Sequence, residues 1–319
     1  MLTGQFGDSK ISKNILVTGA SGFVGSALYK RFLRDGRNVF GLARFPNGED
    51  ANFINGDILS VRETDLRPCQ PDVVIHCAGI TKSPENAAYD KNSELYAVNV
   101  EGALNVARQA SLLKCRRFIF MSSVKVNGEA TGPGQPFTLH HSPAPLDAYG
   151  KSKWEAEKQL LDFASQNGME LVIIRSPLIY GPLVKGNFAA LAKLVDLGVP
   201  LPFGAINNQR SMIFIENLID FIERCLDEPA AAGQTFLVSD AEDISTAEIV
   251  RAIAMAKNKK CFLWPVLPRL IDRFGKLVKR QAQFGRITGS LQIDPSHAMR
   301  VLEWTPRFKV REGIRLSFK

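Results

Sequence analysis

Short apolar runs alternate with longer amphipathic segments through the first half of the chain. Runs rich in β-branched residues, typical of buried parallel strands, lie at 14–18, 38–42, 73–76, 117–121 and 171–175. The segments between them at 23–35, 92–114 and 148–166 are long enough to form helices that cover a face of a sheet. This order of elements predicts an α/β fold with a doubly wound parallel sheet.

The regular alternation ends after residue 176. Four prolines break the following segment into loops and short elements: Pro177, Pro182, Pro200 and Pro202. We expect a larger domain of residues 14–176 plus about 211–235, with 211–226 rejoining the main sheet. Residues 177–210 and 236–319 would then form a smaller, discontinuous C-terminal lobe, and residues 1–13, which lack periodicity, a mobile leader.

Glycine recurs in the loop after the first predicted strand, which reads Gly19-Ala20-Ser21-Gly22-Phe23-Val24-Gly25. Because glycine has no Cβ, the loop can bring backbone N–H groups against a pyrophosphate, whose charge the following helix N-terminus stabilises. An ordinary glycine-rich turn is the alternative. Between a strand and a helix, the pattern favours a Rossmann dinucleotide site formed by Gly19, Ser21, Gly22, Phe23, Val24 and Gly25.

The end of the second predicted strand bears on the choice of dinucleotide. A site for NAD usually has an acidic residue there, whereas this chain has Arg44. An arginine can pair with a 2′-phosphate, so Arg44 favours NADP, although a surface arginine is the alternative. Asp57 could face the adenine amine or could simply cap a turn. The cofactor is therefore NAD or NADP.

A serine, a tyrosine and a lysine follow with a spacing that indicates redox chemistry. Tyr149 and Lys153 stand one helical turn apart, and Ser122-Ser123 ends the strand predicted at 117–121. An ammonium group and a positive nicotinamide would lower the pKa of the Tyr149 phenol, while Ser123 would hold the substrate oxygen. The pattern predicts catalysis by Ser123, Tyr149 and Lys153 together.

The chain as a whole resembles the extended short-chain dehydrogenases/reductases of the NAD-dependent epimerase/dehydratase family. The similarity runs from about residue 14 to the end. It passes through the glycine loop, Asp57-Ile58, His76-Cys77-Ala78-Gly79, Asn99-Val100-Glu101-Gly102, Ser122-Ser123, Tyr149-x-x-x-Lys153, Tyr180-Gly181-Pro182 and Leu302-x-Trp304-x-Pro306.

This resemblance implies roles for further residues. Ile58, Cys77, Ala78, Gly79, Asn99 and Ser122 would join the cofactor site, with Asn99 also steadying the active-site helix. In the lobe, Asn187, Phe203, Arg210 and Arg286 would bind the nucleotide and diphosphate of a UDP-sugar. Core packing for Phe203 and a surface ion pair for Arg210 are the alternatives. The resemblance also implies a homodimer formed through helices 92–114 and 148–166.

Departures from the family pattern narrow the reaction. Val124-Lys125 follows Ser123, where related sugar dehydratases carry Asp-Glu, which argues against dehydration. Chemistry at carbon 4 of the sugar remains. The chain looks most like UDP-N-acetylquinovosamine dehydrogenases, 4-keto reductases of surface-polysaccharide synthesis. The alternative is a UDP-glucose or UDP-N-acetylglucosamine 4-epimerase, and a remote one is an inactive dinucleotide-binding sensor or scaffold.

Composition adds limits. The net charge of +8 is spread along the chain, which suits an anionic pyrophosphate substrate and argues against nucleic acid. The five cysteines show no metal-site or disulfide spacing, so we expect free thiols, no metal and a cytoplasmic enzyme. Segment 262–280 is apolar and basic, compatible with contact at a membrane surface, but its prolines favour a lobe helix.

Overall fold

The computed structural model describes residues 13–45, 51–81, 89–132, 134–277 and 281–319. The leader predicted for residues 1–13 therefore lies outside the described residues, apart from Lys13. That lysine pairs with Asp227 at the end of a helix far along the chain.

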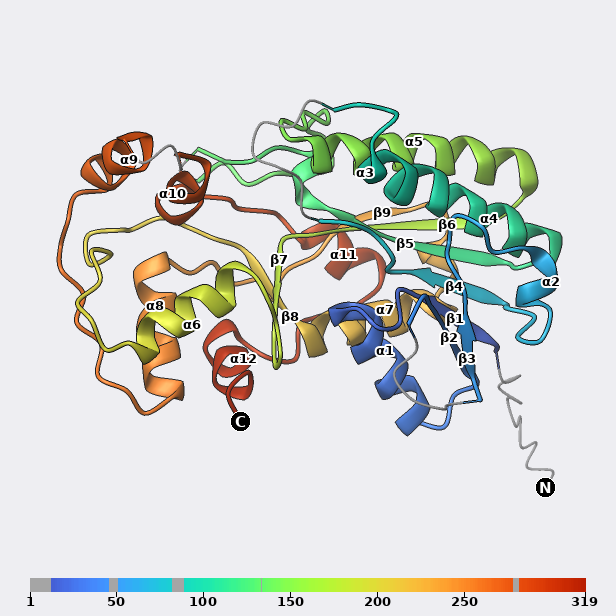
Figure 1. The fold of residues 1–319 in the computed structure, drawn as a ribbon, viewed down its shortest axis with the longest axis horizontal. Coiled ribbons are helices and arrows are strands. Elements are labelled where there is room, and N and C mark those ends of the chain that lie inside the picture. Colours follow the sequence, from blue (N-terminus) through green and yellow to red (C-terminus); the bar gives the residue numbers. More distant parts are fainter. Residues whose placement is uncertain (1–12, 46–50, 82–88, 133, 278–280) are drawn as a thin grey trace, which may run out of the picture.

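A seven-stranded sheet, in the order β3-β2-β1-β4-β5-β6-β9, forms the centre of the larger part of the molecule (Figure 1). All of its neighbouring strands run parallel. The strands are β1 (Ile15–Thr18), β2 (Val39–Ala43), β3 (Phe53–Asn55), β4 (Val73–His76), β5 (Arg117–Ser123), β6 (Glu170–Ser176) and β9 (Thr235–Leu237). The predicted doubly wound α/β class is confirmed.

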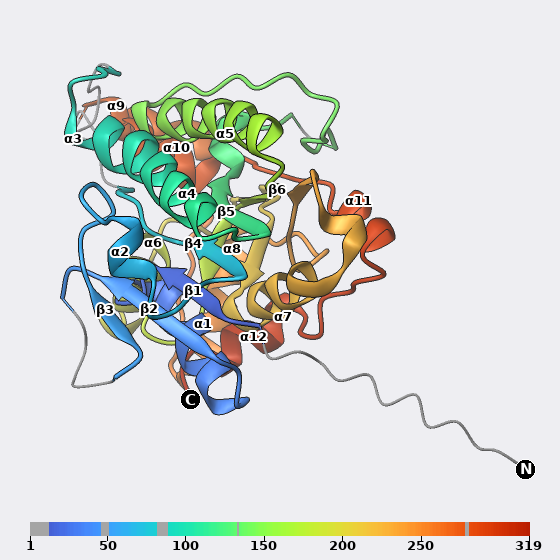
Figure 2. The same cartoon turned by 90° about the vertical axis from the view of Figure 1, so that its right-hand side faces the viewer.

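Helices cover both faces of this sheet (Figures 1 and 2). α1 (Phe23–Arg34) packs beside α7 (Ile215–Asp227) on one face, and α4 (Gly102–Leu112) beside α5 (Ala148–Asn167) on the other. The remaining elements of this part are α2 (Glu63–Leu66), α3 (Glu94–Tyr96), the π-helical η1 (Ala97–Glu101), and the 3-10 turns η2 (Val124–Val126) and η3 (Pro229–Ala231).

The two faces bury alternate residues of the same strands. Ile15 and Val17 of β1 pack in the hydrophobic cluster that contains the α1 and α7 side chains, whereas Leu16 packs with those of α4 and α5. Because both faces are covered, each inner strand is apolar at successive positions. This is why the strand runs could be recognised in the sequence.

The smaller lobe is built on a separate two-stranded parallel sheet of β7 (Leu178–Tyr180) and β8 (Met212–Phe214). Its helices are α6 (Asn187–Asp196), α8 (Thr246–Ala256), α9 (Pro268–Leu277), α10 (Gln281–Thr288) and α12 (Val310–Leu316). Helix α11 (Ser296–Val301) lies against β9 at the edge of the main sheet. Of residues 211–226, β8 joins this second sheet and not the main one, whereas α7 returns to the main sheet and packs beside α1. Pro177 lacks an N–H group, and the chain leaves the main sheet there, so β8 pairs with β7 and β9 takes the edge beside β6.

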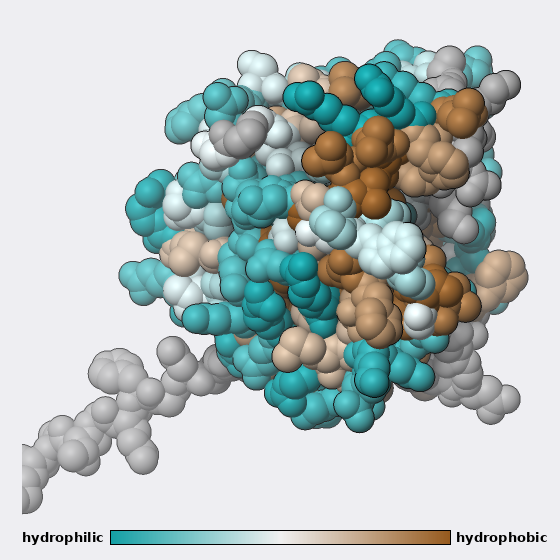
Figure 3. Space-filling view, turned by 90° about the vertical axis from the view of Figure 1, so that its left-hand side faces the viewer, coloured by the Kyte–Doolittle hydropathy of each residue, from teal (hydrophilic) through white to brown (hydrophobic). Residues whose placement is uncertain are grey.

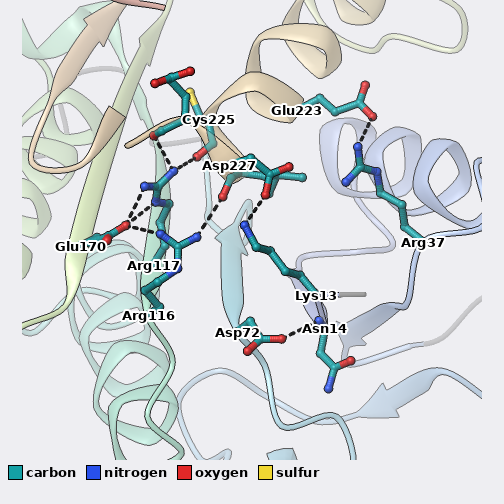
Figure 4. Close-up of polar contacts among 12 residues, drawn as sticks. Lys13, Asn14, Arg37, Asp72, Arg116, Arg117, Glu170, Glu223, Cys225 and Asp227 are labelled. Carbon is teal, nitrogen blue, oxygen red and sulfur yellow. Dashed lines mark hydrogen bonds and ion pairs between the residues drawn. The ribbon is translucent and has the colours of Figure 1, made fainter. Parts of the chain in front are cut away.

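A polar cluster closes the amino-terminal edge of the main sheet (Figure 4). The side chain of Arg117 is fully buried, and its Nε donates to Glu170 Oε2 at 2.7 Å. Its Nη1 donates to the backbone carbonyls of Cys225 and Glu228, the latter at 3.0 Å. Arg116 pairs with the same Glu170 carboxylate at 2.6 Å. One buried guanidinium therefore joins β5, β6 and the end of α7.

All five cysteines are free thiols, as expected from their spacing. Among the helices that the structure describes, none combines the length and the apolar character needed to cross a bilayer.

Candidate active site

The glycine loop between β1 and α1 is closely packed at the carboxyl edge of the sheet. Gly19 has a φ of +66°, and a Cβ there would lie 2.7 Å from the backbone nitrogen of Ala78. A Cβ on Gly25 would lie 2.3 Å from the carbonyl oxygen of Gly19, which accepts a 2.8 Å hydrogen bond from Gly22 N–H. The loop can form only because these positions are glycine.

The N-terminus of α1 is arranged as an anion site. Its first turn holds no acidic residue, and Gly22 at the N-cap has no side chain to cap the free N–H groups. Ser21 is exposed, and Phe23 and Val24 are half-buried in the same turn. These predicted residues are brought together, and the cradle that they form fits the pyrophosphate of a dinucleotide.

The ends of β1 and β4 are tied together beside the loop. Thr18 Oγ1 lies 3.0 Å from His76 Nδ1 and accepts a 3.3 Å hydrogen bond from Ala78 N–H. Cys77 N–H donates to the Thr18 carbonyl at 3.2 Å. Cys77 and Ala78 are thereby held against the glycine loop.

Asn99, on η1, connects the chain after β4 to helix α5. It is fully buried, and its amide exchanges hydrogen bonds with the Ile80 backbone at 2.8 and 3.0 Å. It also donates to Ser152 Oγ at 2.9 Å. Gly79 lies alongside, where a Cβ would stand 3.0 Å from Asn99 Oδ1 and 3.4 Å from Lys153 Nζ. Asn99 thus joins the backbone after β4 to Ser152 on α5.

Ser123, Tyr149 and Lys153 converge where β5 ends and α5 begins. Lys153 is buried, and its Nζ donates to the carbonyl of Met121 at 2.9 Å. Burial lowers the pKa of Lys153 to about 8. Ser123 is buried at the end of β5, and a hydrogen bond links it to the half-buried Tyr149. The three predicted catalytic groups therefore occupy one site.

The acidity of Tyr149 differs from the expectation. Burial of the phenol raises its pKa to about 12, and the Asp147 charge also raises it, while the Ser123 hydrogen bond lowers it. The Lys153 ammonium is directed to Met121, and desolvation outweighs any gain from a nearby cation.

A buried ion pair behind the site was missed from the sequence. Glu157 and Arg175 are both buried, with Arg175 Nη2 2.6 Å from Glu157 Oε2. Arg175 Nη1 also donates to Asn127 Oδ1 at 3.2 Å, and the Ser122 hydroxyl donates to Glu157. Ser122, predicted in the cofactor site, thus turns its side chain towards this pair. Glu157 follows Lys153 by four residues, a spacing that places both on one face of the helix but does not identify Arg175 as its partner.

Charged side chains lie beside Tyr149, and we name the position of Lys125, Glu129 and Asp147 the entrance. Lys125 Nζ pairs with Asp147 and, at 2.9 Å, with Glu129, and it stands 6.0 Å from the Tyr149 ring centroid. Asp147 caps α5 by accepting Gly150 N–H at 2.7 Å. Burial would raise the pKa of Asp147, but its hydrogen bonds from Lys125 and the Gly150 N–H lower it.

Two of the predicted substrate residues lie together at this entrance. Arg210 Nη1 donates to the backbone carbonyl of Arg286 at 2.8 Å. Arg286 stands 3.9 Å from Glu129 and 4.0 Å from Asp147. Burial lowers the pKa of Arg210, and the Arg286 charge adds to this effect. A pair of neighbouring guanidinium groups is suited to a diphosphate.

The other predicted substrate residues have different settings. Phe203 is buried in the main hydrophobic cluster, which matches its core-packing alternative. Asn187 is exposed at the start of α6.

The residues predicted near the adenosine are spread over the edge of the sheet. Arg44 is exposed immediately after β2. Asp57 accepts the Leu59 N–H at 2.9 Å and so caps a turn, as its alternative interpretation predicts. Ile58 is buried against Gly102 on α4, where a Cβ would lie 2.6 Å from its side chain. Within the described residues, no cluster of His, Cys, Asp or Glu could hold a metal ion.

Comparison with known proteins accords with this geometry. The model of a family described as "NAD dependent epimerase/dehydratase family" matches residues 15–239. A Vibrio cholerae protein named UDP-glucose 4-epimerase is 44% identical over 313 residues, covering 97% of this chain and 95% of that protein.

Two further comparisons extend the picture. An Escherichia coli O157:H7 protein named N-acetyl-alpha-D-glucosaminyl-diphospho-ditrans,octacis-undecaprenol 4-epimerase is 30% identical, covering 78% of this chain and 74% of that protein. The crystal structure of a Thermotoga maritima UDP-glucose 4-epimerase with UDP-glucose has a TM-score of 0.77 at 19% identity, covering 96% of this chain and 97% of that chain. The similarity to the Thermotoga maritima structure shows that the two chains share a fold.

Proposed function

The chain belongs to the NAD-dependent epimerase/dehydratase family, and on that basis we propose that it inverts the hydroxyl at carbon 4 of a UDP-sugar. The substrate would be UDP-glucose or UDP-N-acetylglucosamine. The observation that carries the proposal is the convergence of Ser123, Tyr149 and Lys153 beside the glycine cradle of Gly19 and Gly25.

The epimerase interpretation takes precedence over the 4-keto reductase preferred from sequence motifs. The relative at 44% identity carries an epimerase name, and its similarity extends over 97% of this chain. The family is NAD-dependent, so the exposed Arg44 carries little weight as an indication of NADP. An epimerase keeps its dinucleotide through the cycle, whereas a reductase must exchange it.

The larger domain would hold the dinucleotide, with its pyrophosphate at the N-terminus of α1. The chemistry supplied by bound NAD would be reversible hydride transfer at carbon 4, with removal of the hydride from one face of the sugar and its return to the other. Tyr149 would accept the proton of the 4-hydroxyl group and later donate it back, while Ser123 holds the same oxygen. Because a neutral phenol is a weak base, the positive charge of Lys153 and of oxidised nicotinamide would have to favour the phenolate.

Inversion also requires the keto sugar to rotate within the site, so that its opposite face meets the nicotinamide, without leaving the enzyme. Arg210 and Arg286 would retain the diphosphate during this movement, because they lie together at the entrance. Lys125, paired with the Asp147 cap of α5, would keep the entrance beside Tyr149 ordered. The lobe would thus hold the nucleotide while the hexose rotates.

Turnover of defined sugars tests the proposal. The purified protein would be incubated with NAD and either UDP-glucose or UDP-N-acetylglucosamine, and the products followed by proton NMR. We expect a mixture of carbon 4 epimers with no net formation of NADH. Tyr149→Phe should reduce the rate by about 100-fold or more, whereas Tyr96→Phe, whose hydroxyl accepts a 3.2 Å hydrogen bond from Gln159, should not.

A parallel incubation separates the two reactions. UDP-4-keto-6-deoxy-N-acetylglucosamine would be supplied with NADH or NADPH. Stoichiometric oxidation of the reduced cofactor, together with no epimerisation of either hexose, would overturn the epimerase proposal in favour of the reductase.

The family resemblance also implies an oligomeric state for this chain. We propose a homodimer through α4 and α5, whose outward residues include Leu112 and Leu161 at 68% and 42% exposure. Light scattering should give twice the monomer mass, and Leu112→Arg with Leu161→Arg should give a monomer.

A further inference from the structure

The outer end of the smaller lobe carries a group of exposed apolar side chains, which we name the α9 surface. Its members are Phe262 (56% exposed), Trp264 (63%), Leu267 (62%), Leu270 (51%), Phe274 (55%) and Leu277 (80%). Figure 3 shows apolar residues gathered on this side of the molecule, with hydrophilic residues next to them. Single exposed apolar residues are common, but a contiguous group marks a surface for interaction.

Helix α9 divides into faces with different surroundings. Ile271 and Gly275 are buried, and a Cβ on Gly275 would lie 2.7 Å from Phe284 of α10. Leu270, Phe274 and Leu277 recur at four- and three-residue intervals, so they share another face, and each is more than half exposed. The Phe274 ring also packs edge to face against Phe284 of α10, with 5.8 Å between the ring centroids. The apolar character of α9 therefore exceeds what packing in the lobe requires.

A basic stripe adjoins this apolar face. Arg269, Arg273 and Lys276 repeat the same spacing one residue earlier, and all three are exposed. The acidic residue of α9, Asp272, is half-buried and accepts a 2.7 Å hydrogen bond from Thr288 on α10. The outward charge of α9 is therefore positive.

The segment before α9 is held in place by backbone pairing. Leu201 N–H donates to the Phe262 carbonyl at 2.8 Å, and Trp264 N–H donates to the Leu201 carbonyl at 2.9 Å. Gly204 N–H donates to the Trp264 carbonyl at 2.8 Å. The half-buried Leu263 packs against the core, so its neighbours Phe262 and Trp264 project outwards.

We propose that the α9 surface binds an anionic lipid bilayer, with the apolar side chains at the acyl boundary and the basic stripe at the headgroups. An exposed apolar face bordered by cations is the pattern of helices that lie in a membrane interface. Charge favours lipid over a second copy of the chain, because two α9 surfaces in contact would bring Arg269, Arg273 and Lys276 against like charges. The interaction needs neither turnover nor substrate.

Co-sedimentation with vesicles tests the proposal. The full chain should bind vesicles that contain phosphatidylglycerol and should bind pure phosphatidylcholine vesicles much more weakly. Arg269→Glu with Arg273→Glu should raise the lipid concentration needed for half-maximal binding by about tenfold or more. Lys30→Glu with Arg34→Glu, on exposed positions of α1, makes the same change in net charge and should leave binding near that of the unaltered protein.

The apolar contribution is tested separately. Leu270→Asp with Phe274→Asp should abolish binding to the anionic vesicles, whereas Met255→Asp, at a 78% exposed position on α8, should not. Equal binding by the α9 variant and the Met255 control would overturn the proposal. Circular dichroism would confirm that each variant folds.

Trp264 provides a direct measure of contact. It is 63% exposed, whereas Trp304 is 2% exposed and Trp154 half-buried. Anionic vesicles should shift the emission to shorter wavelength, and brominated lipids should quench it, in the unaltered protein but not in Trp264→Phe. Absence of both effects would overturn the proposal. It would also be overturned if the Leu270→Asp, Phe274→Asp variant still bound lipid but no longer formed dimers. Tyr149→Phe should bind vesicles normally, so failure of the catalytic proposal would be distinguishable.

Discussion

The ammonium group of Lys153 donates a 2.9 Å hydrogen bond to the backbone carbonyl of Met121. It is therefore anchored to the strand that ends two residues later in Ser123, and α5 cannot shift along β5 without breaking a buried charge-assisted bond. The relative positions of the proposed catalytic groups are thus set by the fold and do not depend on bound substrate.

The pKa of Lys153 predicts the alkaline limit of activity. Burial lowers it to about 8 from 10.5, so the ammonium loses its proton as the pH rises through about 8. We expect kcat/KM to fall above that pH, since the positive charge that favours the Tyr149 phenolate disappears. Lys151 is exposed on the same helix, and the Lys151→Met variant should show the same fall in kcat/KM above pH 8. An unchanged rate at pH values well above 8 would contradict the prediction.

Gly25 predicts the sensitivity of dinucleotide binding. In Gly25→Ala the new Cβ would stand 2.3 Å from the Gly19 carbonyl, so the loop must open, and we expect NAD affinity to fall by about tenfold or more. A Cβ on Gly285, in α10, would meet no atom within 4 Å. Gly285→Ala should therefore bind NAD normally and gain up to about 1 kcal/mol of stability. Calorimetric titration with NAD separates these outcomes.

The pair of Glu157 and Arg175 predicts a strong energetic coupling. Glu157→Ala leaves a buried guanidinium without its carboxylate and should cost about 3–5 kcal/mol in free energy of unfolding. Replacing both residues by methionine should cost much less than the sum of the single changes. In the solvent-exposed pair of Glu63 and Arg67, the coupling should be much smaller, because water screens the two charges. Denaturant unfolding of the single and double variants measures both couplings.

His76 predicts a loss of stability in mild acid. Burial lowers its pKa to about 3 from 6.5, so below pH 6.5 the unfolded chain binds a proton that the folded chain excludes. Stability due to this residue is complete above pH 6.5 and is lost as the pH falls towards 3, at up to about 1.4 kcal/mol per pH unit. His76→Gln should flatten the dependence of unfolding free energy on pH. His140→Gln, altered at an exposed loop position, should retain the slope of the unaltered protein.

The buried Asp240 makes this comparison necessary. Burial raises its pKa to about 6 from 3.8, so stability due to Asp240 falls as the pH rises from about 4 to 6, opposite to the effect of His76. Subtracting the curve of His76→Gln from that of the unaltered protein removes the Asp240 contribution. A difference that does not change with pH would show that His76 protonates in the folded protein.

The hydrophobic pattern predicted the main sheet because its inner strands are buried on both faces. Strand β5 and helix α5 lie within two residues of their expected bounds. The three-residue strands β3, β7, β8 and β9 were missed, because a segment so short displays no period. Sequence separation also hid which sheet β8 would join.

The parts of the candidate site that could be predicted are those whose residues lie close together in the sequence. The sequence identified three elements of one site: Tyr149 and Lys153 by their four-residue spacing, and the glycine loop by its composition. The ion pair of Glu157 with Arg175 depends on how α5 packs over β6, which no local spacing reveals. The raised pKa of Tyr149 likewise follows from burial in the tertiary structure.

The Arg117 cluster has a consequence for how this enzyme can diversify. It fastens β5, β6 and α7 at the edge of the sheet opposite to Ser123. Mutations around the proposed sugar site therefore act at the other end of β5 from this cluster, and their effects on stability should be independent of changes in the cluster. Because the two regions are separate, substrate preference can change during evolution while the fold stays stable.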